Sequence, residues 1–109
     1  MNYLIEWTPV ALQSLSEVFE YTFEEFGERQ MRRLFNQIIS AVRRIAVFPA
    51  SGILEPKCSE AMGVEYRSIL VISQIKILYT VNGNTIFVEY VRNARLADET
   101  VLERLRGSL

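Results

Sequence analysis

Two stripes of apolar residues at helical spacing, separated by one glycine, constrain the fold of this chain more than any other feature. Across residues 10–26 apolar side chains recur every three or four positions, and the opposite face is acidic. A second stripe covers residues 28–47, and its polar face is basic. Gly27 stands between the stripes, where a helix C′ position favours glycine. The sequence therefore predicts two antiparallel amphipathic helices joined by a tight turn.

Four further segments have the alternation, or the β-branched and aromatic content, that is typical of strands. They are residues 3–7, about 64–73, 75–81 and 85–92. Asn82-Gly83-Asn84 predicts a tight turn between the last two strands, of type I′ because Asn-Gly tolerates positive φ at both central positions. Residues 49–63 contain prolines and glycines and are predicted as a loop. Asp98 is predicted to begin a short last helix.

These elements predict an α+β fold with the order β-α-α-β-β-β, followed by a short C-terminal helix. We expect the helical hairpin to pack on an antiparallel four-stranded sheet, because both layers have one apolar face to bury. The chain has 109 residues and no repeat or linker, so a single domain over residues 1–109 is expected.

Composition limits the chemistry that the chain can perform. Histidine is absent, which removes Ser-His-Asp and Cys-His catalysis and the commonest metal ligand. The only cysteine, Cys58, can supply neither an internal disulfide nor a multi-thiolate zinc site, so we expect no cofactor and no metal. The N-terminus shows no signal-peptide pattern, and no run of about 20 apolar residues is present. We therefore expect a cytoplasmic protein that does not enter a membrane.

Several short motifs occur in a fixed order along the chain. They are Ile5-Glu6-Trp7-Thr8-Pro9-Val10-Ala11, Tyr21 with Phe26-Gly27, Phe48-Pro49-Ala50-Ser51-Gly52, Tyr66-Arg67, Ile77-Leu78-Tyr79 and Val91-Arg92-Asn93-Ala94-Arg95. Each motif is short, but the ordered set resembles the RelE/ParE toxin superfamily over residues 3–96.

The resemblance implies the toxin component of a bacterial type II toxin–antitoxin (plasmid stabilisation) system. It also implies a cognate antitoxin protein that wraps the toxin surface, so we expect an apolar groove left partly exposed when the toxin is alone. ParE-like members poison DNA gyrase, whereas RelE-like members cut mRNA in the ribosomal A site. The sequence gives no indication of the oligomeric state.

The candidate site residues are arginines at the strands. The resemblance implies that Arg67 contacts the scissile phosphate if the chain is RelE-like, and a planar guanidinium suits that contact. The alternative is a solvent-facing strand arginine opposite Glu89. Arg92 and Arg95 close the last predicted strand, where the family carries basic residues. With Arg67 and Lys57 they are candidates for a small cationic patch, and the alternative is an ordinary polar strand end.

Residues 96–102 depart from the nuclease pattern of the family, which places a tyrosine or a similar acid/base residue there. This stretch has no Tyr or His, and although Asp98 or Glu99 could transfer a proton, both would repel RNA. The net charge of −1 also fits ribosome binding poorly, because phosphate neutralisation drives such binding. Both departures favour a ParE-like gyrase inhibitor that is not an enzyme. The alternatives are a RelE-like endoribonuclease acting through the strand arginines, and a decayed toxin acting only as a binding module.

Overall fold

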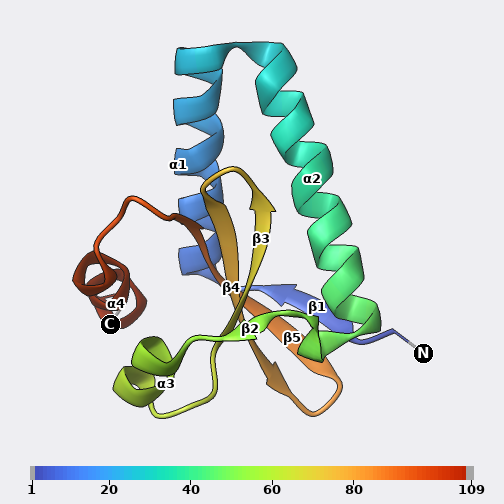
Figure 1. The fold of residues 1–109 in the computed structure, drawn as a ribbon, viewed down its shortest axis with the longest axis vertical. Helices are drawn as coiled ribbons and strands as arrows, with labels where there is room; N and C mark the ends of the chain where they lie inside the picture. The colour runs from blue at the N-terminus through green and yellow to red at the C-terminus, as the bar shows by residue number, and fades with distance from the viewer. Residues whose placement is uncertain (1, 108–109) are drawn as a thin grey trace.

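The computed structural model describes residues 2–107, in which two long helices stand above a curled sheet (Figure 1). The elements in chain order are β1 (Leu4–Trp7), α1 (Pro9–Phe26), α2 (Glu28–Val47), the 3₁₀ turn η1 (Pro49–Ser51), β2 (Ile53–Leu54), α3 (Pro56–Met62), β3 (Arg67–Ile72), β4 (Ile75–Asn82), β5 (Thr85–Asn93) and α4 (Asp98–Gly107). The predicted α+β fold, with a helical hairpin on a sheet and a short C-terminal helix, is confirmed. None of the helices among residues 2–107 combines the length and the apolar character needed to cross a membrane.

The helical hairpin begins and turns where the sequence indicates. The Thr8 hydroxyl accepts a hydrogen bond from the Ala11 N–H at 3.1 Å, and Pro9 occupies the first helical position, where no N–H is needed. Gly27 has φ +88°, in the region that favours glycine, and joins α1 to α2 without a longer loop. The local sequence therefore fixes the hairpin.

The sheet contains five strands in the order β1-β5-β4-β3-β2, so it differs in detail from the expected four antiparallel strands. β1 pairs with β5 in parallel, from Leu4 opposite Thr85 to Trp7 opposite Val88, and the other pairs are antiparallel. The hairpin returns the chain to the start of β1, where the Tyr3 N–H donates a hydrogen bond to the Ala46 carbonyl at 2.8 Å. Strands β3, β4 and β5 then alternate in direction, so β5 runs the same way as β1. Strand direction of this kind depends on the tertiary path, which periodicity does not report.

The segment predicted as a loop over residues 49–63 is structured, and this prediction is wrong in part. It contains η1, the two-residue strand β2 and the seven-residue helix α3. Pro56 begins α3, and Gly63 ends it with φ +76°. These elements are too short to show a periodic apolar pattern, so their prolines and glycines were the only signal.

The turn between β4 and β5 also differs from the prediction. Asn82 pairs with Thr85, which leaves Gly83 and Asn84 as the two loop residues. Of these only Gly83 has positive φ, at +62°. This is the pattern of a type II′ turn rather than type I′, and the hairpin itself is confirmed.

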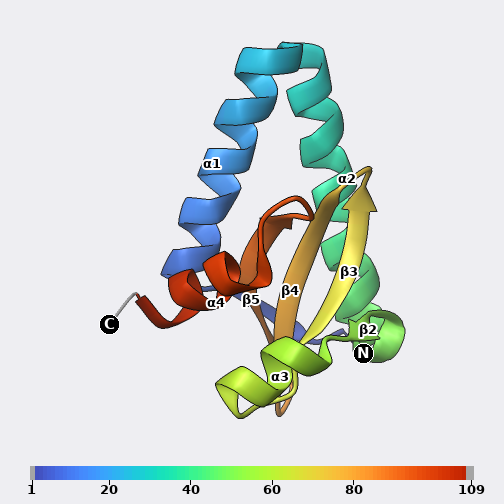
Figure 2. The ribbon, with the colours of Figure 1, turned by 60° about the vertical axis from the view of Figure 1, so that its left-hand side comes forward.

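Two apolar clusters hold the layers together on opposite faces of the sheet. The cluster between the hairpin and the sheet contains Ala11, Leu34, Ile38, Ala41, Ile45, Ile69, Ile77, Tyr79, Ile86 and Val88. The cluster beneath α3 and α4 contains Tyr66, Leu78, Tyr90 and Val101. The free end of the hairpin extends beyond the sheet (Figures 1 and 2). Its aromatic side chains are therefore left exposed, among them Tyr21, Phe23, Phe26 and Phe35.

Candidate functional site

Arg67 begins β3 and is bound within the protein. Its Nη1 donates a hydrogen bond to the Gly52 carbonyl at 2.8 Å, and its Nε lies 3.3 Å from the Glu65 carboxylate. Only 24% of the side chain is exposed. The guanidinium therefore ties the 48–52 segment to the sheet.

The hydroxyl of Tyr79 holds the same segment from the neighbouring strand. It donates a hydrogen bond to the Pro49 carbonyl at 2.6 Å and accepts one from the Gly52 N–H at 3.0 Å. A Cβ on Gly52 would overlap the Tyr79 hydroxyl and lie 2.7 Å from the Ser68 carbonyl oxygen. These contacts hold the Phe48-Pro49-Ala50-Ser51-Gly52 motif against the sheet. The sequence gives core packing as the expected role of Tyr79, which is confirmed, but sequence reasoning missed the two hydrogen bonds of its hydroxyl.

Arg92, at the end of β5, is bound to the last helix. Its Nη2 donates to the Asp98 carboxylate and to the Leu96 carbonyl, each at 2.7 Å. The hydrogen bond from Arg92 to the Asp98 carboxylate holds the pKa of Asp98 below its usual value. Lys57 Nζ lies 3.4 Å from Asp98 and 3.4 Å from Glu99, so α3, α4 and β5 meet at these charges. Arg92 and Lys57 are thus brought together, but around carboxylates rather than in a free cationic patch.

Arg67 and Arg92 lie on opposite faces of the sheet. Arg67 pairs with Tyr79, whose side chain belongs to the cluster under the hairpin. Arg92 pairs with Lys76, and the alternation along β4 turns Lys76 to the face opposite Tyr79. A single phosphate cannot contact both guanidinium groups in this arrangement.

Glu89 does not lie opposite Arg67, so this part of the alternative interpretation is wrong. A bulge in β5 pairs Tyr79 with Val88 and leaves Glu89 as an extra residue. Its carboxylate accepts a hydrogen bond from the Thr80 hydroxyl at 2.8 Å, and burial raises its pKa. Sequence periodicity could not reveal this position, because a bulge interrupts the alternation.

Arg95 is exposed and borders a cleft of about 860 Å³ under the free end of the hairpin. The cleft lies between the hairpin, the β3–β4 turn and the end of β5. Its walls are mainly apolar and aromatic, including Val18, Tyr21, Phe26, Leu34, Ile72 and Ile75. Arg33, Arg95 and Arg104 also line it, and Arg104 lies 2.7 Å from Glu17. This cleft matches the partly exposed apolar groove that we expect, with a cationic rim.

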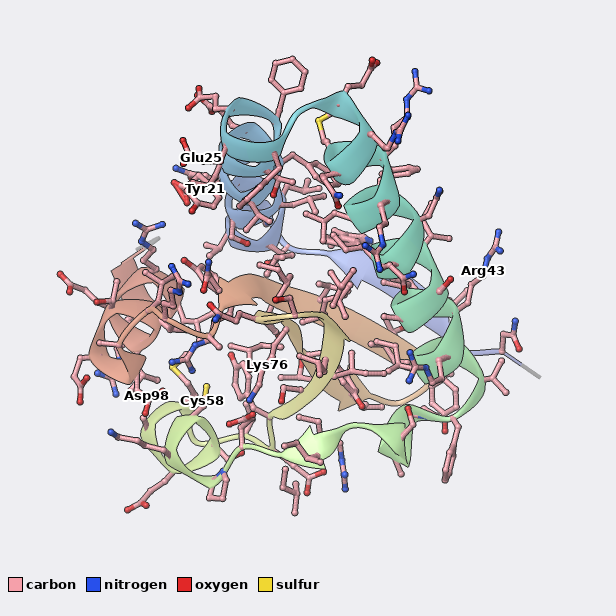
Figure 3. The ribbon with its side chains drawn as sticks, turned by 45° about the horizontal axis from the view of Figure 1, so that its top comes forward. Tyr21, Glu25, Arg43, Cys58, Lys76 and Asp98 are labelled. Atoms are coloured by element: carbon pink, nitrogen blue, oxygen red, sulfur yellow. The ribbon has the colours of Figure 1, made fainter. Side chains whose placement is uncertain are left out.

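Cys58, in α3, is half-buried. Burial raises the pKa of the Cys58 thiol to about 11, so the thiol stays protonated at neutral pH. Figure 3 shows Cys58 and Asp98 near each other where α3 meets α4. Over residues 2–107 no group of three or more Cys, Asp or Glu side chains is arranged to hold a metal ion. The cleft and the arginines that line it remain as the features that could recognise a partner.

The chain is similar to known proteins in sequence and in structure. The family model for the ParE toxin of type II toxin–antitoxin system, parDE, matches residues 5–97. A solved structure described as the chromosomal ParDE TA system from P. aeruginosa is similar, with a TM-score of 0.68 and 18% identity. The match covers 85% of this chain and 97% of that chain, and at this identity it shows a shared fold. No curated protein matches the sequence.

Proposed function

The chain belongs to the ParE toxin family of type II toxin–antitoxin systems, and we propose that it inhibits DNA gyrase by binding and is neutralised by a cognate antitoxin. One observation carries the choice of binding over RNA cleavage. The nuclease alternative needs Arg67 together with Arg92 or Arg95. Arg67 and Arg92 face opposite sides of the sheet and are bound within the protein, and Arg95 is exposed at the border of the cleft under the hairpin. The family match supports a toxin, and this geometry supports one that acts without a catalytic centre.

We propose the cleft under the hairpin as the place where the antitoxin docks. Its apolar walls suit the apolar face of an amphipathic segment, and Arg33 and Arg95 suit acidic residues on the flank of that segment. A segment that folds on binding could cover the cleft despite the cost of ordering it. The partner expected from this chemistry is an acidic amphipathic helix.

A supercoiling assay with the purified full chain tests the gyrase proposal. We expect micromolar protein to inhibit supercoiling and to accumulate cleaved DNA, and the antitoxin to reverse both effects. Absence of inhibition together with unaffected growth on expression would instead indicate a decayed toxin.

Toe-printing on translating ribosomes tests the nuclease alternative. Our proposal predicts no A-site cuts. Cuts that persist in Arg67→Lys and disappear in Arg67→Ala, with both variants folded by circular dichroism, would replace gyrase binding with a RelE-like activity.

A further inference from the structure

The hairpin carries an apolar seam on the side turned away from the sheet. Leu12 and Phe23 of α1 are each 52% exposed, and Phe35 of α2 is 50% exposed. Residues 12, 19 and 23 are seven and four positions apart, so they follow one stripe of α1. Phe19 belongs to this stripe, and its ring centroid lies 6.0 Å from that of Phe35. We define these four residues as the outer seam.

The outer seam lies outside the cleft, and of its four residues Phe19 also packs against the core cluster under the hairpin. The residues of α1 that are buried against the sheet are Ala11 and Ser14, on a different face of the helix from the seam. Tyr21, which lines the cleft, lies with Glu25 on the flank of α1 that faces away from α2 (Figure 3). An occupant of the cleft would therefore leave the seam uncovered.

Opposite charges flank the seam on its two helices. Glu20 and Glu24 follow one row of α1, and Arg29 and Arg32 occupy the matching part of α2, within about two helical turns of Gly27. Arg32 lies 3.1 Å from Glu28 of its own helix. Among residues 2–107, Glu20, Glu24 and Arg29 make no ion pair.

We propose that two copies of this chain associate through their outer seams to form a four-helix bundle. A two-fold axis parallel to the helices places α1 of each copy on α2 of the other, so the acidic flank of one copy meets the basic flank of its partner. A two-fold axis perpendicular to the helices would instead stack α1 of one copy on α1 of the other, so two acidic flanks would meet. The axis parallel to the helices keeps both turns at one end, and Glu24 then faces Arg29 across the interface.

The area of the hairpin face indicates which class of interface to expect. The 18 residues of α1 make a helix of about 27 Å, and two adjacent helices are about 20 Å wide. The footprint is on the order of 500–600 Å² per copy, somewhat below the roughly 800 Å² per partner of standard interfaces. Interfaces at this low end of the range are typically weak and transient, so we expect a reversible monomer–dimer equilibrium.

Sedimentation velocity of the purified full chain, from about 1 to 200 µM at low salt, tests this proposal. We expect a monomer–dimer equilibrium that Phe23→Glu weakens by about tenfold or more. Val64→Glu is the matched control, because Val64 is 55% exposed but lies after α3, away from the hairpin. It should leave the equilibrium unchanged.

Charge reversal tests the orientation of the two copies. Glu24→Arg and Arg29→Glu should each weaken the dimer, and the double variant should restore it to within about twofold of the original constant. Thermal unfolding confirms that each variant is folded. A chain that stays monomeric throughout, or a dimer that Phe23→Glu leaves intact, would overturn the proposal. So would a monomer in which Phe23→Glu lowers affinity for the antitoxin, because the seam would then belong to that partner.

Discussion

Replacing Tyr79 with Phe should destabilise the fold strongly although it removes a single oxygen. The ring stays buried in the cluster under the hairpin, so packing is preserved. The Gly52 N–H and the Pro49 carbonyl both lose their partner. Gly52 is buried, whereas Pro49 is half-buried and its carbonyl can gain water in part. An unsatisfied buried group costs about 1–3 kcal/mol, so we expect a loss of about 2–3 kcal/mol from the free energy of unfolding.

Urea and thermal unfolding measure this loss. For a domain of this size a change of about 2–3 kcal/mol corresponds to a fall in Tm of roughly 10–20 °C. Tyr21→Phe is the control, because Tyr21 is half-exposed on the hairpin and its variant should change stability by less than about 0.5 kcal/mol. If Tyr79→Phe also changes stability by less than about 0.5 kcal/mol, the Tyr79 hydroxyl does not hold the 48–52 segment on the sheet.

Three further predictions concern titrating groups. Burial raises the folded-state pKa of Glu89, so ionisation of this carboxyl opposes folding. Glu89→Gln keeps an acceptor for the Thr80 hydroxyl and should raise the free energy of unfolding, measured in urea, near neutral pH. The gain should vanish below the unfolded-state pKa of about 4.3. Arg92 lowers the pKa of Asp98, so the ionised Asp98 carboxylate stabilises the fold above its unfolded-state pKa, and this contribution is lost as pH falls. Asp98→Asn should therefore lower the free energy of unfolding slightly at neutral pH and have less effect in acid. Cys58, with a pKa of about 11, should react slowly with a thiol reagent at neutral pH and quickly once urea unfolds the chain.

The helical hairpin could be predicted from sequence because its signals are local. Two long periodic stripes, the Thr8-Pro9 start and Gly27 agree with one another, and each acts within a few residues. The parallel pairing of β1 with β5 could not be predicted, because it joins residues about 80 positions apart through the tertiary path. Strand β2 has two residues, which is fewer than any periodic pattern requires.

The candidate site was harder to predict than the fold. Apolar residues occur at both alternations of β3, so the sequence could not assign Arg67 to a face. The partners that bind it, Gly52 and Glu65, belong partly to a segment predicted as a loop. Arg92 could be placed at the end of its strand, but its ion pair with Asp98 depends on how α4 folds back. Two of the three candidate arginines, Arg67 and Arg92, are therefore bound within the fold, whereas Arg95 is exposed at the cleft.

Helix α4 contacts Arg92 at one position and lines the cleft at another, and its anchoring determines how salt should act on antitoxin binding. Its Asp98 holds Arg92, and its Arg104 lines the cleft beside Glu17. The Arg104–Glu17 pair is about half-exposed, so it adds little to the docking of the helix, whereas Val101 is 2% exposed and anchors it. Added salt should therefore leave the wall of the cleft in place and screen only the attraction of its cationic rim for an acidic segment. A fall in antitoxin affinity with salt, at unchanged near-UV circular dichroism, would report on the rim and not on loss of the helix.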